Sequence, residues 1–501
     1  MGEDRTPVLI GAGQYIQRDV DPAAAKEPLG MMVETARRAA ADAGADAGLL
    51  RQLDYVAVVN VLAWRYANAP RLLAQRLEAA PKQELYTTVG GDTPQWLVNE
   101  TAAQIAAGRV RLALLAGAEA MHTMWRARHA GVELKWSTDG VGAPTIVGDA
   151  RMGTSDHEMN HGLQMPTQVY PLFENALRVH YRLSLAAHRE RLGLLCSRFS
   201  SIAAHNPYAW FRQARTPAEI ATITADNRLI GFPYPKYMNA VIDVDQSAAV
   251  LMTCVGAARE LGIDPSRWVY LTGCGDARDL WFVTERVNYY SSPAIRMAGR
   301  LALRMAGVDI SQIDYFDLYS CFPCAVQISR DMLGIAEDDP RPLTITGGLP
   351  YHGGPGNNYT MHGIATMMGK LRAARGTKGL VSGLGWYMTK HSIGIYSSEP
   401  KPGTWARPDP EVYQAEIDRA PHPELATEPS GSATVETYTV LHDRDGQPTK
   451  GIVIGRLQDG RRFVANTLED RSVFEALMTR EAVGTAGKAS SAGGLNRFKP
   501  D

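Results

Sequence analysis

Short apolar runs and amphipathic segments follow one another in the first part of the chain. Residues 8–10 form an apolar strand candidate that ends in Gly-Ala-Gly. Residues 29–43 carry apolar side chains at the three- and four-residue spacing of a helix, which Gly44 ends. The apolar run at residues 55–62 predicts a buried strand. A strand, a helix and a second strand in this order predict an α/β unit.

The same pattern returns in the second half of the chain. Three segments match three later ones in the same order: 8–19 with 269–279, 37–46 with 300–309, and 50–61 with 310–321. Because the order is kept, the matches predict an internal duplication of one α/β unit.

The segment between the two units has a different composition. Residues 121–240 are rich in aromatic residues, Met, Pro and His, with short helical stretches and no strand repeat, which indicates an insertion. The first unit therefore comprises residues 1–120 and 241–265, and the second comprises residues 266–398. Within the first unit, a Gly-Gly-Asp-Thr-Pro sequence precedes a helix predicted over residues 93–107.

The composition changes again after residue 398. Residues 399–430 are rich in Pro and polar residues, as linkers are. Residues 431–482 contain three strand candidates joined by Asp-Gly turns and predict a small β module. Residues 483–501 are rich in Gly, Ser and Ala, and we expect them to be disordered.

Composition and charge limit the classes of function that the sequence supports. The net charge of −1 provides no overall attraction to nucleic acid or to an anionic membrane. No apolar run reaches the roughly 18 residues of a membrane span. The N-terminus lacks the pattern of a signal peptide, and five cysteines in 501 residues do not make a disulfide framework. These features favour a cytoplasmic protein.

Residues 346–367 carry the densest candidate chemistry. They contain six glycines, two histidines and two asparagines before an apolar helical segment. Glycines of this density let backbone N–H groups approach a ligand, and a following helix start favours an anion or a developing oxyanion. A tight surface connection whose histidines face water is the alternative.

Together these segments resemble the thiolase superfamily, most closely its sterol-carrier-protein thiolases and thiolase-like relatives. The resemblance covers about residues 7–398 and rests on six segments: 90–108, 112–121, 197–212, 245–252, 317–327 and 347–359. It implies a duplicated five-layer αβαβα fold with an insertion (loop) domain and a small C-terminal barrel-like β domain that is similar to an oligonucleotide/oligosaccharide-binding (OB) fold. It also implies an acyl-CoA ligand and the acetyl-CoA acetyltransferase class of acyltransferases.

The resemblance also identifies which catalytic side chains are replaced. Gly91 stands where a thiolase carries its nucleophilic cysteine, and Gly354 stands at the histidine of the Gly-His-Pro loop. Gly383 or Gly385 stands at the second cysteine. Thiolysis through an acyl-cysteine is therefore not expected.

Two replacements for the lost groups remain open. Cys321, His352, His362 or His391 lie on the same loops, and a histidine serves as a base near neutral pH. Alternatively, Tyr319 stands where steroid side-chain aldolases of the superfamily carry a tyrosine.

Those aldolases cleave a 3-hydroxyacyl-CoA by retro-aldol chemistry and work with a small β-barrel partner. Tyr351 or Tyr359 would then provide a second phenol. A non-catalytic acyl-CoA carrier, or a scaffold that recruits a partner through its β module, is the other class of function. In that class the tyrosine and cysteine are packing residues and the histidines are solvated.

The implied ligand is a coenzyme A thioester, with no covalently bound cofactor. We expect three residues of the insertion to hold it: Arg198, His205 and Asn206. The turn at Gly91 and Asp92 and the loop residues Gly353, Gly354 and Asn357 would form the oxyanion side. Protein association is expected either through a homodimer edge or through the β module, and no nucleic-acid partner is expected.

Two short motifs have weaker support. His157, Glu158 and His161 match HExxH, but the flanking glycines leave barely two helical turns and no third ligand is specified. Cys321 and Cys324 match CxxC without a second pair or thioredoxin-like surroundings. We therefore expect no metal site.

Overall fold

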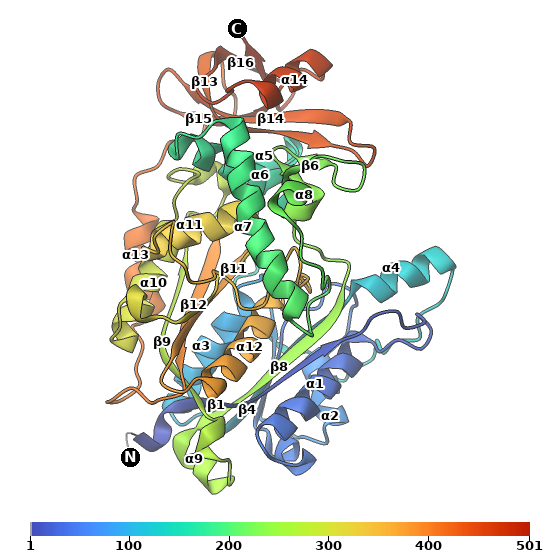
Figure 1. Ribbon diagram of the computed structural model, residues 1–501, viewed down its shortest axis with the longest axis vertical. Coiled ribbons are helices and arrows are strands. Elements are labelled where there is room, and N and C mark those ends of the chain that lie inside the picture. Colours follow the sequence, from blue (N-terminus) through green and yellow to red (C-terminus); the bar gives the residue numbers. More distant parts are fainter. Residues whose placement is uncertain (1–2) are drawn as a thin grey trace.

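The computed structural model describes residues 3–501 and contains one ten-stranded sheet built from two similar units (Figure 1). The first unit contributes β1 (Pro7–Ile16), β2 (Tyr55–Val58), β3 (Gln83–Thr87), β4 (Leu112–Ala120) and β8 (Asp245–Cys254). The second contributes β9 (Val269–Arg278), β10 (Tyr315–Asp317), β11 (Lys378–Gly385) and β12 (Lys390–Ser397). The strand order is β10-β11-β12-β9-β1-β8-β4-β2-β3-β5, where β5 is Thr145–Val147.

The strand pairing confirms the predicted duplication. In the first unit β1–β8 and β8–β4 are antiparallel and β4–β2 is parallel. In the second unit β9–β12 and β12–β11 are antiparallel and β11–β10 is parallel, so the order and directions repeat. The two units join where Val8 and Leu9 of β1 pair with Tyr270 and Val269 of β9.

A close helix–strand contact explains why Gly-X-Gly occurs in both units. A Cβ on Gly11 or Gly13 would overlap carbonyl oxygens of helix α1 (Pro28–Asp42). A Cβ on Gly273 or Gly275 would overlap the equivalent carbonyls of helix α10 (Pro293–Ala306). In both units the motif lets a helix lie directly on its strand.

The helices form three layers around the two sheet halves. Helix α1 and α2 (Ala69–Arg76) cover the outer face of the first half. Helix α10 and α11 (Pro323–Leu333) cover the outer face of the second half. Helices α3 (Thr93–Ala106) and α12 (Tyr359–Ala373) are buried between the halves and share one apolar core with strands of both. The five-layer αβαβα arrangement is therefore confirmed.

The insertion contains longer helices than its composition suggests. Its elements are α4 (Met121–Ala130), β5, α5 (Asp156–Asn160), α6 (Pro166–His180), α7 (Leu185–His205), α8 (Pro217–Ala221), β6 (Leu229–Gly231) and β7 (Tyr234–Pro235). Helix α6 accommodates Pro171, and a Ser184 side chain caps α7. In Figure 1, α7 runs along the body toward the C-terminal module, and α4 projects from the side. Helix α9 (Val255–Glu260) connects the first unit to the second.

The C-terminal module is a closed five-stranded barrel. Its strands are β13 (Gly431–His442), β14 (Pro448–Leu457), β15 (Arg462–Asn466), β16 (Ala486–Ala492) and β17 (Leu495–Pro500), with α14 (Arg471–Thr479) between β15 and β16. The ring order is β13-β14-β15-β17-β16 and back to β13, with β15 parallel to β17. The predicted barrel-like domain is confirmed.

The predicted disorder of residues 483–501 is wrong, because this segment provides two of the five barrel strands. Only alternate side chains of these strands are buried, so a low apolar content is sufficient. The glycine at 487 makes room for the Phe498 ring.

Residues 399–430, predicted as a linker, contain the helix α13 (Pro410–Asp418). This helix packs on β9, where the Gln414 side chain forms hydrogen bonds of 2.8 Å with both the N–H and the carbonyl of Arg278.

Candidate functional site

The glycine-rich loop and the start of α3 meet between the two units. The Asn357 side chain accepts a hydrogen bond from the Gly90 N–H at 2.8 Å. Thr360 Oγ1 donates to the Gly91 carbonyl at 2.8 Å, and Asn358 Nδ2 donates to the Gly117 carbonyl at 2.7 Å. The structure thus brings Gly91, Asp92 and Asn357 together, although they are far apart in the sequence.

Tyr319 fills the space beside Gly91. A Cβ on Gly91 would overlap the Tyr319 phenol oxygen and would lie 2.6 Å from both Tyr319 Cζ and the Leu384 carbonyl oxygen. Tyr319 is buried, and burial together with the nearby Cys321, Tyr359 and Asp92 raises its pKa well above the ordinary value of 10. The phenol is therefore protonated at neutral pH.

Asp92 and Lys390 fill the space beside Gly385, one of the two glycines predicted to stand at the second cysteine. A Cβ on Gly385 would overlap Asp92 Oδ1 and would lie 2.8 Å from Lys390 Cε. Lys390 Nζ is 3.5 Å from Asp92 Oδ1 and donates to the Val89 carbonyl at 2.8 Å. Both side chains are buried. The glycines at these positions therefore make room for a new ion pair.

His352 and His362 form a buried pair whose imidazole centroids lie 5.0 Å apart. Nδ1 of His362 bonds Gln14 Oε1 at 2.8 Å, and Nε2 of each ring has no hydrogen-bond partner within residues 3–501. Burial lowers the pKa of His352 to about 4 and that of His362 well below 6.5. Neither imidazole is poised to accept a proton near neutral pH.

Cys321 is buried against Tyr170, and burial raises the pKa of its thiol to about 12. A reactive thiol needs a lowered pKa, so this geometry is that of a packing residue. Cys324 is also buried, with Sγ 3.6 Å from the Tyr170 carbonyl oxygen.

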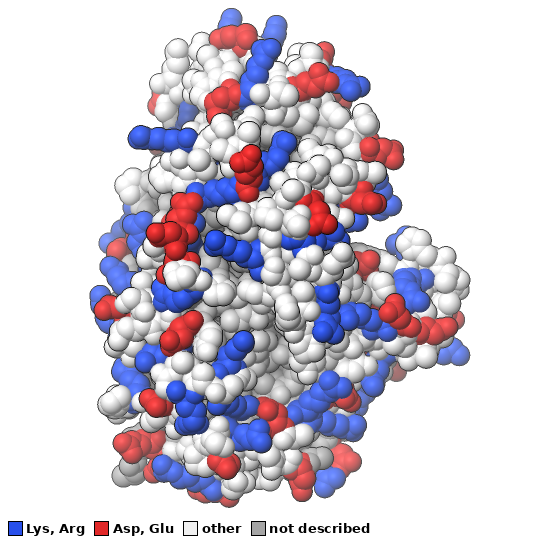
Figure 2. Space-filling model, viewed as in Figure 1, with Lys and Arg blue, Asp and Glu red and all other residues white. Residues whose placement is uncertain are grey.

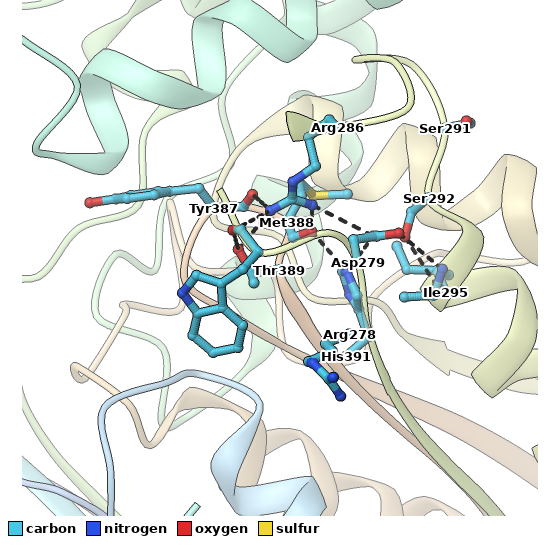
Figure 3. Close-up of polar contacts among 12 residues, drawn as sticks. Arg278, Asp279, Arg286, Ser291, Ser292, Ile295, Tyr387, Met388, Thr389 and His391 are labelled. Atoms are coloured by element: carbon cyan, nitrogen blue, oxygen red, sulfur yellow. Dashed lines mark hydrogen bonds and ion pairs between the residues drawn. The ribbon is translucent and has the colours of Figure 1, made fainter. Parts of the chain in front are cut away.

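His391 belongs to a buried ion cluster centred on Asp279, which Figure 3 shows between Arg286, Ser292 and His391. His391 Nε2 lies 3.3 Å from Asp279 Oδ2, and Arg286 Nη1 lies 3.7 Å from the same oxygen. Asp279 also accepts from Ser292 Oγ and from the Ala294 N–H at the start of α10. This cluster anchors α10 to β12 and separates His391 from the other predicted catalytic groups.

Arg198 lines a groove, which the other two predicted CoA-binding residues of the insertion do not line. The groove of about 650 Å³ runs between α7 and the segment at residues 336–343. His205 lies at the exposed end of α7, where its Nδ1 is 2.9 Å from the Ser201 carbonyl oxygen. Asn206 is buried and donates to the Thr346 carbonyl at 2.9 Å, so it ties the insertion to the glycine-rich loop.

The two glycines of the loop differ in the room around them. Gly353 has a φ of +104°, and a Cβ there would lie 2.5 Å from Gln246 Oε1. The nearest atom to a Cβ on Gly354 would be Leu349 Cδ2 at 3.3 Å, so this position accepts a small side chain. The Gly354 N–H already donates to the Val241 carbonyl at 2.7 Å.

Sequence reasoning missed Lys390 and the roles of Tyr319 and Asp92 as space-filling groups. A signal was present, because a lysine opens a strand that also contains Ile393, Ile395 and Tyr396 and is buried along its whole length. The partner of Lys390 comes from the other unit and is visible only in three dimensions.

The HExxH segment is structural. Glu158 accepts from both the N–H and the hydroxyl of Thr284, and His161 Nε2 accepts from the Asn496 N–H at 2.8 Å. Within the part of the chain that the structure describes, no three His, Cys, Asp or Glu side chains gather as a metal site would require.

Fold and site together define a thiolase-like α/β protein to which a barrel is fused. The crystal structure of a monomeric SCP2-thiolase like protein type 1 from Mycobacterium smegmatis matches with a TM-score of 0.87 and 36% identity over 100% of both chains. The chain belongs to this family of SCP2-thiolase-like proteins type 1. The family model for the thiolase-like protein type 1 additional C-terminal domain matches residues 413–493.

More distant proteins share parts of the chain or its fold. Acetyl-CoA acetyltransferase 1 of Arabidopsis thaliana is 28% identical over 144 residues, which are 29% of this chain and 32% of that protein. The chain thus spans about a third of the length of this curated relative.

Two solved structures show the fold alone. The Ltp2-ChsH2(DUF35) aldolase has a TM-score of 0.61 at 17% identity, covering 80% of this chain and 99% of that one. An acetyl-CoA acetyltransferase from Syntrophomonas wolfei has a TM-score of 0.53 at 15% identity, covering 79% and 99%.

Proposed function

We propose that the protein binds an acyl-CoA without forming an acyl-cysteine. The observation that carries this proposal is the Tyr319 phenol in the space beside Gly91, where the nucleophile of a thiolase would stand. No thiol replaces the nucleophile, because the nearby Cys321 has a pKa raised to about 12 by burial. The family retains the acyltransferase-type fold, and the proposed function is ligand binding within it.

The groove beside α7 supports the binding of coenzyme A phosphates. Four arginines line it: Arg191, Arg198, Arg330 and Arg341. Arg191 pairs with Glu337, and Arg341 pairs with Asp339 at 2.5 Å. Arg198 is exposed and forms no ion pair within residues 3–501, which leaves its guanidinium available to a phosphate.

The floor of the groove leads toward the glycine-rich loop. Phe199 lines the groove, and a Cβ on Gly348 would lie 2.6 Å from the Phe199 ring. A pantetheine chain entering beside α7 would therefore reach the loop by displacing one side chain.

Calorimetry with coenzyme A and acetyl-CoA tests this proposal. Replacing Arg198 by Glu should weaken binding roughly tenfold, because one charge-assisted phosphate contact becomes repulsive. The matched control is Arg480→Glu, which reverses the charge of an exposed arginine near the barrel. The proposal fails if neither ligand binds, if both variants weaken binding equally, or if mass spectrometry detects an acyl adduct on a cysteine.

A retro-aldol lyase is the second candidate, and the position of Tyr319 favours it. The Tyr319 ring contacts the Tyr359 ring at a centroid distance of 5.6 Å and stands at the start of α3. Because burial keeps the phenol protonated, Tyr319 would act as a proton donor to the departing enolate. The fused barrel and the fold shared with the Ltp2-ChsH2(DUF35) aldolase add support.

Incubation with 3-hydroxyacyl-CoA separates the two candidates. A lyase releases a carbonyl compound and a shortened acyl-CoA, and Tyr319→Phe should abolish this cleavage while calorimetric binding persists. If the wild-type protein binds the thioester and forms no product, the protein is a carrier.

Nucleic acid is not the proposed partner of the barrel. The strands that bind oligonucleotides in OB folds are the second and third, here β14 and β15. Ile452, Ile454 and Val464 of these strands belong to the core shared with the second unit. Figure 2 shows acidic and basic side chains interspersed over the visible face of the molecule.

We propose that the protein is monomeric, like the M. smegmatis protein. Strand β5 pairs in parallel with β3 and occupies the sheet edge that a second copy would need. Light scattering should report the mass of one chain, and a dimer mass would contradict this. No helix within residues 3–501 has the length and apolar character needed to cross a membrane.

A further inference from the structure

A second cavity of about 230 Å³ lies on the other side of the Gly90–Gly91 turn from the glycine-rich loop. It is bounded by the start of α3, the ends of β3 and β5, the paired strands β9 and β12, and α13. None of its lining residues lines the groove beside α7. At about 30 Å³ for each water volume, it has room for a molecule of roughly six to eight non-hydrogen atoms.

Two polar atoms on residues that line this cavity have unused hydrogen-bonding capacity, and one of them, Asp92 Oδ1, has only the 3.5 Å ion pair with Lys390. Thr88 Oγ1 and Asp92 Oδ1 are buried and form no hydrogen bond with any described residue. The two residues are 9% and 5% exposed. Because unpaired buried polar atoms are costly, they indicate a bound molecule in the working protein.

Lys390 provides the complementary charge. Its ammonium has three N–H donors, of which one reaches the Val89 carbonyl and one points across 3.5 Å to Asp92. One donor is therefore left for a ligand. The same cavity wall thus presents a cation, a hydroxyl and a carboxylate oxygen that accepts no hydrogen bond.

The other two aspartates on the cavity wall are already paired, and the one glutamate, Glu411, is exposed. Asp149 is held by Arg151 Nη2 at 2.6 Å, and Asp276 is held by Arg407 Nη1 at 2.8 Å. The buried side chains with hydrogen-bonding capacity left for a ligand are therefore those of Thr88, Asp92 and Lys390. A carboxylate ligand alone would leave Asp92 Oδ1 with only its 3.5 Å ion pair to Lys390, and an amine alone would leave the third donor of Lys390 unused.

We infer that this cavity binds a small zwitterion, a molecule of amino-acid size with one ammonium and one carboxylate. The ligand ammonium donates to Asp92 Oδ1, and the ligand carboxylate accepts from Lys390 Nζ and Thr88 Oγ1. This charge pattern satisfies all three groups at once and places an opposite charge against each of the two ionised side chains. The inference is independent of the proposed acyl-CoA groove, because the two cavities share no lining residue.

Calorimetry with three molecules of matched size tests the inference: β-alanine, propylamine and propionate. We expect β-alanine to bind at least roughly tenfold more tightly than either single-charge molecule. Thr88→Val, which replaces one hydroxyl by a methyl group, should weaken β-alanine binding roughly tenfold, and Asp92→Asn should weaken it further. Thr479→Val at the exposed end of α14 is the matched control, because it makes the same exchange outside both cavities, and it should change nothing.

Each result decides the matter. Three results would overturn the inference. Propylamine or propionate binds as tightly as β-alanine, β-alanine does not bind at millimolar concentration, or the Thr88→Val variant binds β-alanine as tightly as the wild type. Coenzyme A binding is measured on the same samples and shows that each variant is folded. If the wild-type protein binds β-alanine and does not bind coenzyme A, the proposed function is rejected and the inferred zwitterion site is retained.

Discussion

The phenol oxygen of Tyr319 lies where the side chain of residue 91 would begin. A side chain at residue 91 and the Tyr319 phenol exclude each other, because both would occupy the same space. The same holds at Gly385, whose missing side chain leaves space for the Asp92–Lys390 pair. Both spaces are thus filled, and a cysteine introduced at residue 91 is not expected to produce thiolase chemistry.

Gly91→Ala should therefore destabilise the protein by about 1–3 kcal/mol, the usual cost of overpacking a filled core. Its Cβ would press on Tyr319 and on the Leu384 carbonyl, and a backbone carbonyl cannot move aside cheaply. Urea unfolding measures the change. Gly354→Ala is the matched control and should cost under about 1 kcal/mol, because its nearest neighbours are 3.3 and 3.4 Å away. Equal costs for the two variants would contradict the packing of Tyr319.

Alkylation of the native protein tests the state of Cys321. A thiol pKa of about 12 leaves roughly one Cys321 in 10,000 as thiolate at pH 8, so iodoacetamide should leave it unmodified. Cys254 is the partly exposed cysteine of the chain and should react first. Peptide mass spectrometry gives the order of labelling. If Cys321 reacts before Cys254, its thiol is activated, and Cys321 would again be a candidate nucleophile.

Much of the architecture could be predicted from local patterns. The same helix–strand contact occurs in each unit, at Gly11 and Gly13 and again at Gly273 and Gly275. The repeated glycines therefore allow the duplication to be predicted from the sequence. The barrel tail was missed because its composition is low in apolar residues, while a barrel strand needs only every second side chain buried.

The site was harder to predict for a physical reason. Gly91 and Gly354 identify which groups are absent, and this follows from alignment of motifs. What replaces them depends on which long side chain reaches across the interface between units. Tyr319 comes from the end of β10 and Lys390 from the start of β12, and only the fold places both beside α3.

Acid should destabilise the protein through His352. Its folded-state pKa of about 4 is below the ordinary 6.5, so the unfolded chain binds more protons between these values. The stability contribution is complete above pH 6.5 and is lost as the pH falls toward 4, on the order of 3 kcal/mol. Urea unfolding between pH 7 and pH 4 should show this slope, and His352→Gln should flatten it. The exposed His205→Gln should leave the slope unchanged, and an identical profile in both variants would rule out His352 as a source.

The attachment of the barrel depends on a buried arginine. Arg462 is fully buried, pairs with Glu436 at 2.7 Å, and donates to the carbonyls of Thr284 and Arg286 in the second unit. Replacing it by Met keeps the volume but leaves Glu436 with only the partly exposed Arg456 and two carbonyls without donors. We expect a loss of about 3–5 kcal/mol, typical of breaking a buried pair.

The neighbouring Arg461 provides the control for this prediction, because its side chain is 48% exposed and its ion pair with Asp459 lies at the surface. Arg461→Met should change stability by less than about 1 kcal/mol. Limited proteolysis adds a second measurement, since Arg462→Met should release the barrel by cleavage in residues 399–430 well before the body is digested. If Arg462→Met unfolds like Arg461→Met and resists cleavage, apolar contacts of β14 and β15 hold the barrel without the arginine. Barrel and body would then be joined chiefly by the core that Ile452, Ile454 and Val464 share with the second unit.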